Sequence, residues 1–212
     1  MKTQFDVPFS CPPDIAPYLQ KVFDGEYDIP LFFYGPHILD LGANCGSFAL
    51  WASHRFPACT IDAYEPHPKT FEILKRNVEP YKNITIHNFG VGTPGLRVLC
   101  NGKNNSGEAS FHLPADNLAP TGQHLDVHDP MELPEADMIK LDIEGCEMEV
   151  LEPLITSGRK FNIIMLEWHN HSLRRRVDAL LKDYFLIGSN VHSMAGLGVD
   201  KYMHKSLLPG VV

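Results

Sequence analysis

Short apolar runs alternate with amphipathic segments along most of this chain. Five runs consist mainly of apolar or β-branched residues and end in polar or glycine residues, as strands buried in a parallel sheet do. They cover residues 38–41, 59–64, 84–88, 136–141 and 161–166. Helical spacing of apolar side chains marks residues 47–56, 68–78, 146–155 and 173–181. With two further strands expected at 184–187 and 198–203, the pattern predicts a doubly wound, Rossmann-like α/β sheet of about seven strands.

Two parts of the chain do not follow this alternation. Residues 1–36 carry six prolines, which forbid a long helix, although residues 15–23 suit a short one. We expect residues 1–36 to form an N-terminal cap over the ligand mouth of a single-domain protein whose ligand-binding part spans 37–212. Strands are expected at 96–100 and 109–113, and the proline-rich residues 114–134 are predicted to be an exposed excursion that selects the substrate.

The run at 38–41 leads into a turn that contains two glycines, Gly42 and Gly46. Gly42 lets the backbone bend sharply and approach a ligand closely. The helix expected next begins with N–H groups that point into the turn and favour an anionic or polar ligand group. A dinucleotide site would show G-x-G-x-x-G, whereas this turn has G-x-x-x-G after the acidic Asp40, so no pyrophosphate is expected.

An acidic residue also follows the second apolar run. Glu65 stands 23 residues after Gly42, close to the roughly 20-residue offset at which a carboxylate accepts both hydroxyls of a ribose. An adenosine-like ligand without a diphosphate fits both the turn and this acid. The two features together predict S-adenosylmethionine as the cofactor.

Three blocks of sequence carry a resemblance to a known family. They are ILDLGANCGSFALWA at 38–52, YEPHPKTFEILKRNV at 64–78 and IKLDIEGCEMEVL at 139–151. In this order and spacing they resemble the FkbM family of S-adenosylmethionine-dependent methyltransferases, and NNSGEASF at 104–111 is similar to a polar segment of that family. The resemblance implies a class I methyltransferase sheet whose final strand runs antiparallel at or near one edge.

The predicted cofactor site follows from the position of residues at strand ends. Open α/β sheets bind ligands outside the carboxyl ends of their strands, near the reversal of strand order. Gly90 and Val91, after the third run, are therefore expected to flank the adenine. The full set of predicted cofactor-binding residues is Asp40, Gly42, Ala43, Asn44, Gly46, Glu65, Pro66, Asn88, Gly90, Val91 and Asp142.

Two residues are candidates for the chemistry of methyl transfer. The donor is already activated, so the protein mainly has to align the acceptor and exclude water, and a base is needed only for a hydroxyl acceptor. Asp142 leaves the fourth run at the expected crevice and is the first candidate; its alternative role is to cap the next helix, unless Glu144 does so. His169, just beyond the fifth run, is the second, because an imidazole titrates near neutral pH.

Neighbouring polar residues raise the question of a metal. Asp142, Glu167 and Asn170 offer the hard oxygen ligands that Mg²⁺ accepts. A zinc-like set is offered by Glu167, His169 and His171, but it comes from one short segment without a distant ligand. The family resemblance implies neither site, so no metal is expected.

Charge and cysteine content narrow the class of protein. The chain has 18 Lys and Arg against 26 Asp and Glu, a formal net charge of −8, which is unlike the basic surfaces that bind nucleic acid. Its one basic run, residues 174–176, is expected to be a solvated helix face. Five cysteines without a C-x-x-C pair indicate a reduced, cytoplasmic protein, and no stretch approaches the roughly 20 apolar residues of a membrane span.

These observations predict an O-methyltransferase that uses S-adenosylmethionine and acts on a hydroxyl of a small molecule, a sugar or a secondary metabolite. The hydroxyl acceptor is implied by the family resemblance alone. Two alternatives stay open: a methyltransferase acting on RNA ribose or on a nitrogen, and a non-catalytic module that only binds S-adenosylmethionine. A contiguous basic, aromatic surface around the crevice would favour RNA.

Overall fold

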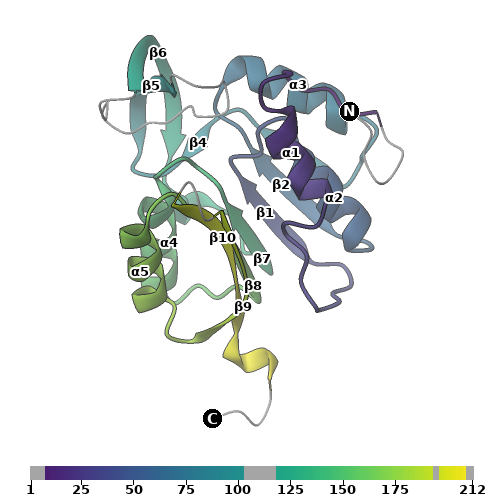
Figure 1. Cartoon of the computed structure of the whole chain (residues 1–212), viewed down its shortest axis with the longest axis vertical. Coiled ribbons are helices and arrows are strands. Elements are labelled where there is room, and N and C mark those ends of the chain that lie inside the picture. Colours follow the sequence, from purple (N-terminus) through teal and green to yellow (C-terminus); the bar gives the residue numbers. More distant parts are fainter. Residues whose placement is uncertain (1–7, 103–117, 193–195, 209–212) are drawn as a thin grey trace.

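The main sheet has seven strands in the part of the chain that the computed structural model describes, residues 8–102, 118–192 and 196–208. Their spatial order is β3-β2-β1-β7-β8-β10-β9 (Figure 1). The bounds are β1 His37–Leu41, β2 Thr60–Tyr64, β3 Ile84–His87, β7 Met138–Leu141, β8 Ile163–Trp168, β9 Tyr184–His192 and β10 Leu197–His204. The predicted Rossmann-like sheet of seven strands is confirmed.

The order of the strands reverses beside β1. This strand pairs in parallel with β2 on one side and with β7 on the other, and Leu41 is in register with both Tyr64 and Leu141. β10 runs antiparallel to its neighbours β8 and β9 and lies one strand from the edge, as the family resemblance implied. The carboxyl ends of β1, β2, β7 and β8 therefore meet along one rim, where ligands of such sheets bind.

Helices cover both faces of the sheet (Figure 1). α1 (Ala16–Phe23), α2 (Ser47–Arg55) and α3 (Pro68–Val78) share a hydrophobic core with Ile38 and Ile61. α4 (Glu147–Thr156) and α5 (His171–Leu180) pack over the other face, in a core with Leu39 and Leu141. Alternate residues of one strand thus enter opposite cores, as the two-residue period of a strand requires.

Local sequence explains where two of the helices begin. α3 starts at Pro68, which suits the first helical turn, and the Nδ1 atom of His67 accepts a hydrogen bond of 3.3 Å from the Thr70 N–H. α5 follows Asn170, whose Oδ1 atom accepts a hydrogen bond of 2.8 Å from the Leu173 N–H. The expected bounds of the first of these helices, 68–78, agree with the structure.

A second, smaller sheet replaces part of the excursion expected at 114–134. Its order is β4-β6-β5, with β4 at Gly90–Val91, β5 at Gly95–Gly102 and β6 at Leu118–His128. The expectation was wrong for residues 118–128, because pairing with β5 and β4 stabilises an extended chain there and directs Leu125 and Val127 into the interior. The motif at 104–111 and the strand expected at 109–113 lie outside the described residues.

The N-terminal segment packs on the same core as α2. The helix expected at 15–23 is α1, and the ring of Tyr27 lies 5.0 Å from that of Phe48, centroid to centroid. The role of residues 1–36 as a cap stays a prediction. Two short 3-10 helices, Pro130–Glu132 and Lys205–Leu207, complete the described elements.

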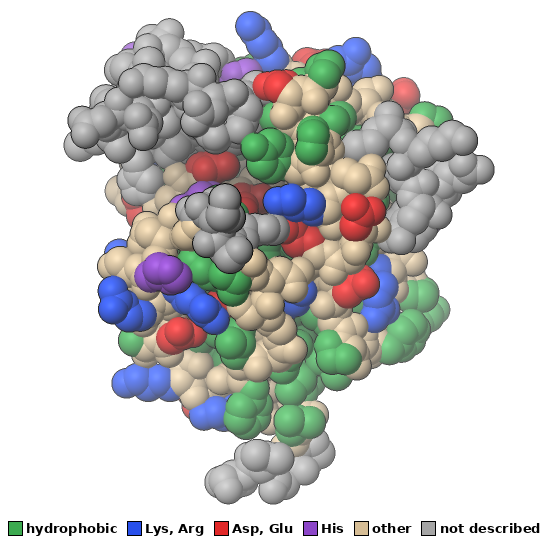
Figure 2. Space-filling view, in the orientation of Figure 1, with side chains coloured by type: hydrophobic (Ala, Val, Ile, Leu, Met, Phe, Trp, Pro, Cys, Tyr) green, Lys and Arg blue, Asp and Glu red, His purple; other side chains and the backbone are tan. Residues whose placement is uncertain are grey.

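Basic side chains do not gather into one patch on the face shown in Figure 2, where Lys and Arg are spread from top to bottom among acidic and uncharged side chains. The basic run 174–176 is only partly a solvated helix face, because the Arg174 Nε atom lies 2.8 Å from Oδ2 of the buried Asp200. None of the helices in the described ranges is long and apolar enough to cross a membrane.

Candidate functional site

The glycine turn after β1 is tied to the two neighbouring strands. The N–H groups of Gly42 and Ala43 both donate to the Tyr64 carbonyl, at 3.0 and 2.9 Å. Gly42 has a φ angle of +75°, and a Cβ atom there would lie 1.8 Å from the Asp142 carbonyl oxygen. The close approach of the backbone after β7 therefore requires a glycine here, and the role of Gly42 beside a ligand stays a prediction.

A buried ion pair lies beneath the turn. The Lys140 Nζ atom, on β7, lies 3.1 Å from Asp40 Oδ1, and it donates to the carbonyls of Gly42 at 2.7 Å and Leu41 at 3.3 Å. Burial alone would lower the pKa of Lys140, but the carboxylates of Asp40 and Asp142 outweigh it and raise that pKa. The lysine is therefore charged and connects the turn to the sheet.

This pair changes the interpretation of one predicted cofactor-binding residue. Asp40 is fully buried with its carboxylate toward Lys140, so it supports the turn from below and presents no surface to a ligand. Burial raises the pKa of Asp40, opposed by the neighbouring ammonium group. Sequence reasoning missed Lys140, although a lysine inside the apolar run at 138–141 is a signal, because a charge in a buried strand needs a partner.

Glu65 lies beside the turn at the end of β2. Its Oε2 atom accepts a hydrogen bond of 2.9 Å from the Asn44 N–H, and its Oε1 atom accepts one of 2.8 Å from the His67 N–H. Burial raises the pKa of Glu65 to about 7, despite these two donors. Each oxygen of an ionised carboxylate keeps a second acceptor position, so this side chain fits the two hydroxyls of a ribose.

The remaining predicted cofactor residues lie beyond the carboxyl ends of β1, β2 and β3 and have different surroundings. The amide of Asn88 donates to the carbonyls of Glu65 and Pro66, at 2.8 and 3.3 Å, and so fixes the backbone beyond β2. Gly90 and Val91 form β4, where the side chain of Val91 is buried in a hydrophobic core. Gly46, with a φ angle of +90°, precedes α2, and a Cβ atom there would lie 2.8 Å from Leu74 Cδ1.

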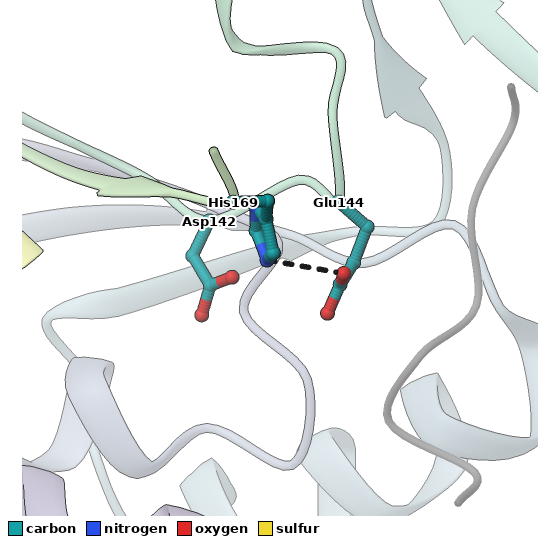
Figure 3. A group of neighbouring side chains, drawn as sticks. All are labelled: Asp142, Glu144 and His169. Carbon is teal, nitrogen blue, oxygen red and sulfur yellow. Dashed lines mark ion pairs between the residues drawn. The ribbon is translucent and has the colours of Figure 1, made fainter. Parts of the chain in front are cut away.

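A cluster of charged side chains occupies the ends of β7 and β8 (Figure 3). The Nε2 atom of His169 lies 3.2 Å from Glu144 Oε2 and 3.9 Å from Glu167 Oε2, and its Nδ1 atom lies 3.7 Å from Glu147 Oε1. Burial lowers the pKa of His169, but the surrounding carboxylates outweigh it and raise that pKa to about 9. The imidazole is thus protonated at neutral pH.

Asp142 and Glu167 share a hydrogen bond within this cluster and titrate differently. Burial raises the pKa of Asp142, but Lys140, 3.7 Å away, and the hydrogen bond from Glu167 outweigh it, so the pKa is lowered. Burial and the nearby carboxylate of Asp142 raise the pKa of Glu167 well above its ordinary value. The surroundings therefore favour the ionised form of Asp142 and the protonated form of Glu167.

The helix after β7 does not use Asp142 or Glu144 as its cap. The Oε1 atom of Glu147, inside the first turn of α4, accepts hydrogen bonds from the Ile143 N–H at 3.3 Å and the Gly145 N–H at 3.0 Å. Cys146 occupies the N-cap position of α4 and no side chain makes a capping hydrogen bond there, so the capping alternative for Asp142 is removed. Asn170 is engaged as the cap of α5, which leaves it poorly placed as the oxygen ligand that the sequence suggested.

Comparison with known proteins gives three relevant similarities. The model of the methyltransferase FkbM domain matches residues 40–186. Methyltransferase sdnD of Sordaria araneosa is 25% identical over 205 residues, covering 78% of this chain and 79% of that protein. Hexuronic acid methyltransferase AglP of Haloferax volcanii is 25% identical over 146 residues, covering 61% of this chain and 54% of that protein.

The fold also matches solved structures. Precorrin-6y C5,15-methyltransferase from Geobacter metallireducens GS-15 superposes with a TM-score of 0.53 over 95% of both chains, at 14% sequence identity. At that identity the similarity concerns the fold alone, a Rossmann-like sheet of mostly parallel strands.

Proposed function

The chain belongs to the FkbM family of S-adenosylmethionine-dependent methyltransferases, and from this premise we propose that it methylates a hydroxyl group of a small molecule, a sugar or a secondary metabolite. Bound S-adenosylmethionine supplies an activated methyl group. Residues 37–212 are proposed as the catalytic domain and residues 1–36 as its cap.

The cofactor is proposed to bind over the glycine turn. Glu65 would accept the hydroxyls of the ribose, and the polar backbone of residues 42–46 at the start of α2 would face the methionine part. Gly90 and Val91 keep the proposed position beside the adenine. What supports this placement is the free acceptor capacity of the buried Glu65 carboxylate at the end of β2.

The observation that best supports a hydroxyl group as the methyl acceptor is the Asp142 carboxylate beside the turn, whose surroundings favour its ionised form. Methyl transfer to an oxygen requires the acceptor to be aligned and its proton to be accepted. Lys140 keeps Asp142 ionised and within 3.7 Å, while Glu167 holds it with a hydrogen bond. Asp142 is therefore proposed to orient the hydroxyl and take its proton.

His169 is the second candidate for the base. A pKa of about 9 means that it carries its proton at neutral pH, so it can act as a base only after losing that proton. It would serve first to hold Glu144 in place and to balance the negative charge of the cluster.

A sugar is a reasonable acceptor class, since one relative is named as a hexuronic acid methyltransferase. RNA is a weaker candidate, because the carboxylates of Asp142 and Glu144 line the rim and would repel a phosphate backbone. The spread of basic side chains on the face in Figure 2 agrees with this view.

The proposal is tested by mass spectrometry of a cell extract incubated with the protein and deuteromethyl-labelled S-adenosylmethionine. The expected product is a small hydroxylated compound that gains one labelled methyl group, and fragmentation places the label on oxygen. A label on nitrogen or on RNA would contradict the proposal. Binding of the cofactor without any labelled product would favour the non-catalytic alternative.

Replacement of Glu65 by Gln is expected to weaken S-adenosylmethionine binding by about 1–3 kcal/mol, because charge-assisted hydrogen bonds become neutral ones. The amide oxygen can still accept one of the two backbone N–H groups, so the fold should persist. Isothermal titration calorimetry measures the dissociation constant. An unchanged value in a folded variant would remove Glu65 from the cofactor site.

The same residue predicts a pH dependence of binding. The pKa of Glu65 in the free protein is about 7, and the ionised form is the one that accepts two ribose hydroxyls. The dissociation constant should therefore rise as the pH falls through about 7 and be constant well above it. Calorimetry at pH 5.5 to 8.5 tests this, and the slope should disappear in Glu65→Gln.

A further inference from the structure

Three side chains of the crevice have the arrangement of a metal site. Asp142 and Glu144, after β7, and His169, after β8, each direct one ligand atom into the same space, and these atoms lie within 4.8 Å of one another (Figure 3). The shortest separation is 3.2 Å, between His169 Nε2 and Glu144 Oε2. We call these three residues the crevice triad.

A buried carboxylate stands behind the histidine of this triad. Glu147 is fully buried and its Oε1 atom lies 3.7 Å from Nδ1 of His169. Within the part of the chain that the structure describes, neither that Nδ1 atom nor Oε2 of Glu147 has a hydrogen-bond partner, and both atoms are buried. Histidines that bind metals typically direct their second nitrogen at such a carboxylate, which leaves the first nitrogen aimed at the ion.

Charge around the triad is out of balance. Besides its own two carboxyl groups, those of Glu147 and Glu167 lie within 4 Å of the same imidazole. The basic side chains that face these carboxyl groups are His169 itself and Lys140, which also lies beside the buried Asp40. Acidic groups crowded in this way are stabilised by a bound cation, which is the strongest local charge a protein site can hold.

We propose that Asp142, Glu144 and His169 bind a divalent transition-metal cation. Ions such as Mn²⁺ or Zn²⁺ bind more readily to one imidazole and two carboxylates than to a ligand set of oxygen atoms alone. About a quarter of each of these side chains is exposed, so part of the coordination sphere faces the crevice. The proposal replaces the sequence-based expectation that no metal takes part.

The cation would assist the proposed methyl transfer, and this role rests on the proposed function. A divalent ion polarises an oxygen that reaches it and lowers the pKa of a hydroxyl group. This effect would assist an acceptor beside Asp142 at a pH where a free hydroxyl keeps its proton. It would also select acceptors with two neighbouring oxygens, such as the diols and hydroxy acids of sugars, because these can chelate the ion.

The test measures binding of the cation alone, without S-adenosylmethionine or acceptor. Protein stripped with a chelator and dialysed is titrated with MnCl₂ and followed by calorimetry and by electron paramagnetic resonance of free Mn²⁺. We expect one ion per chain. Glu144→Gln should weaken binding at least about tenfold, and Glu147→Gln by about 10–100-fold through misorientation of His169.

A matched control is available at the surface. Glu132 lies 3.2 Å from the Nδ1 atom of His128, which resembles the Glu144–His169 pair, but both side chains are more exposed than their counterparts in that pair. Glu132→Gln should leave Mn²⁺ binding unchanged. Paramagnetic broadening of the His169 imidazole signal in the unaltered protein, assigned with His169→Asn, provides a second measurement that does not depend on folding of the Glu144 variant.

Two results would overturn the proposal: no stoichiometric binding of Mn²⁺, Zn²⁺ or Mg²⁺ below about 1 mM, or equal affinity in the wild type and Glu144→Gln. Cofactor binding is measured separately in excess chelator. If S-adenosylmethionine binds and the cations do not, the metal inference fails while the proposed function stands. If the cation binds and S-adenosylmethionine does not, the proposed function fails while the metal site stands.

Discussion

Replacement of Asp142 by Asn is expected to lower turnover by about 10²–10⁴-fold, the usual contribution of a positioned base. The substitution keeps the size of the side chain but removes the charge that orients the acceptor and takes its proton. Cofactor affinity should change little, because Glu65 and the turn are left intact. The measurement is kcat with the true acceptor, alongside the dissociation constant of S-adenosylmethionine.

Glu167→Gln is the matched variant for this experiment. Burial and the carboxylate of Asp142 raise the pKa of Glu167 well above its ordinary value, so an amide imitates the protonated form that this position favours, and the loss of turnover should be much smaller. Titrating Mn²⁺ into both variants separates two roles of Asp142. Recovery of turnover at high Mn²⁺ identifies a ligand, and a loss at every concentration identifies a base. If Asp142→Asn keeps full turnover without added ion, Asp142 is not the base, and His169 becomes the leading candidate.

Replacement of Lys140 by Met is expected to destabilise the protein by about 3–5 kcal/mol, because it leaves the buried Asp40 carboxylate without a partner. The variant also loses the hydrogen bonds to the carbonyls of Leu41 and Gly42. Urea denaturation followed by circular dichroism gives the change in the free energy of unfolding.

The double variant Asp40→Asn/Lys140→Met distinguishes the ion pair from the volume of the side chains. With both charges removed, the buried charge penalty disappears, and the double variant should be more stable than Lys140→Met alone. If the single and double variants are equally destabilised, the role of Lys140 is limited to its carbonyl contacts. A loss below about 1 kcal/mol in Lys140→Met would contradict the importance of the pair.

Elements with strong local signals could be predicted from the sequence. The bounds of α3 were predicted at 68–78 because Pro68 begins the helix and Pro80 follows its end. β6 could not be predicted, since residues 118–128 are polar, contain Pro120 and are extended only because β4 and β5 pair with them. Strand propensity of this kind depends on neighbours that are distant in sequence.

The same distinction between local signals and contacts distant in sequence applies to the candidate site. Glu65 and the glycine turn lie within 23 residues of each other, and a general pattern of spacing relates them. The contacts of Lys140 with Asp40 and Gly42 span almost 100 residues and exist because β7 pairs with β1. Likewise, Glu144 and Glu147 acquire their relation to His169 only when β8 lies beside β7.

The contacts of Lys140 connect the two halves of the crevice. Its ammonium group touches the Gly42 carbonyl in the proposed cofactor turn and lies 3.7 Å from the Asp142 carboxylate in the proposed acceptor site. A shift of the turn on one side therefore changes the electrostatic field at the carboxylate on the other, without any hinge between them. Thermodynamic linkage makes such an effect reciprocal: if the bound cofactor increases the affinity for the acceptor, the bound acceptor increases the affinity for the cofactor by the same factor.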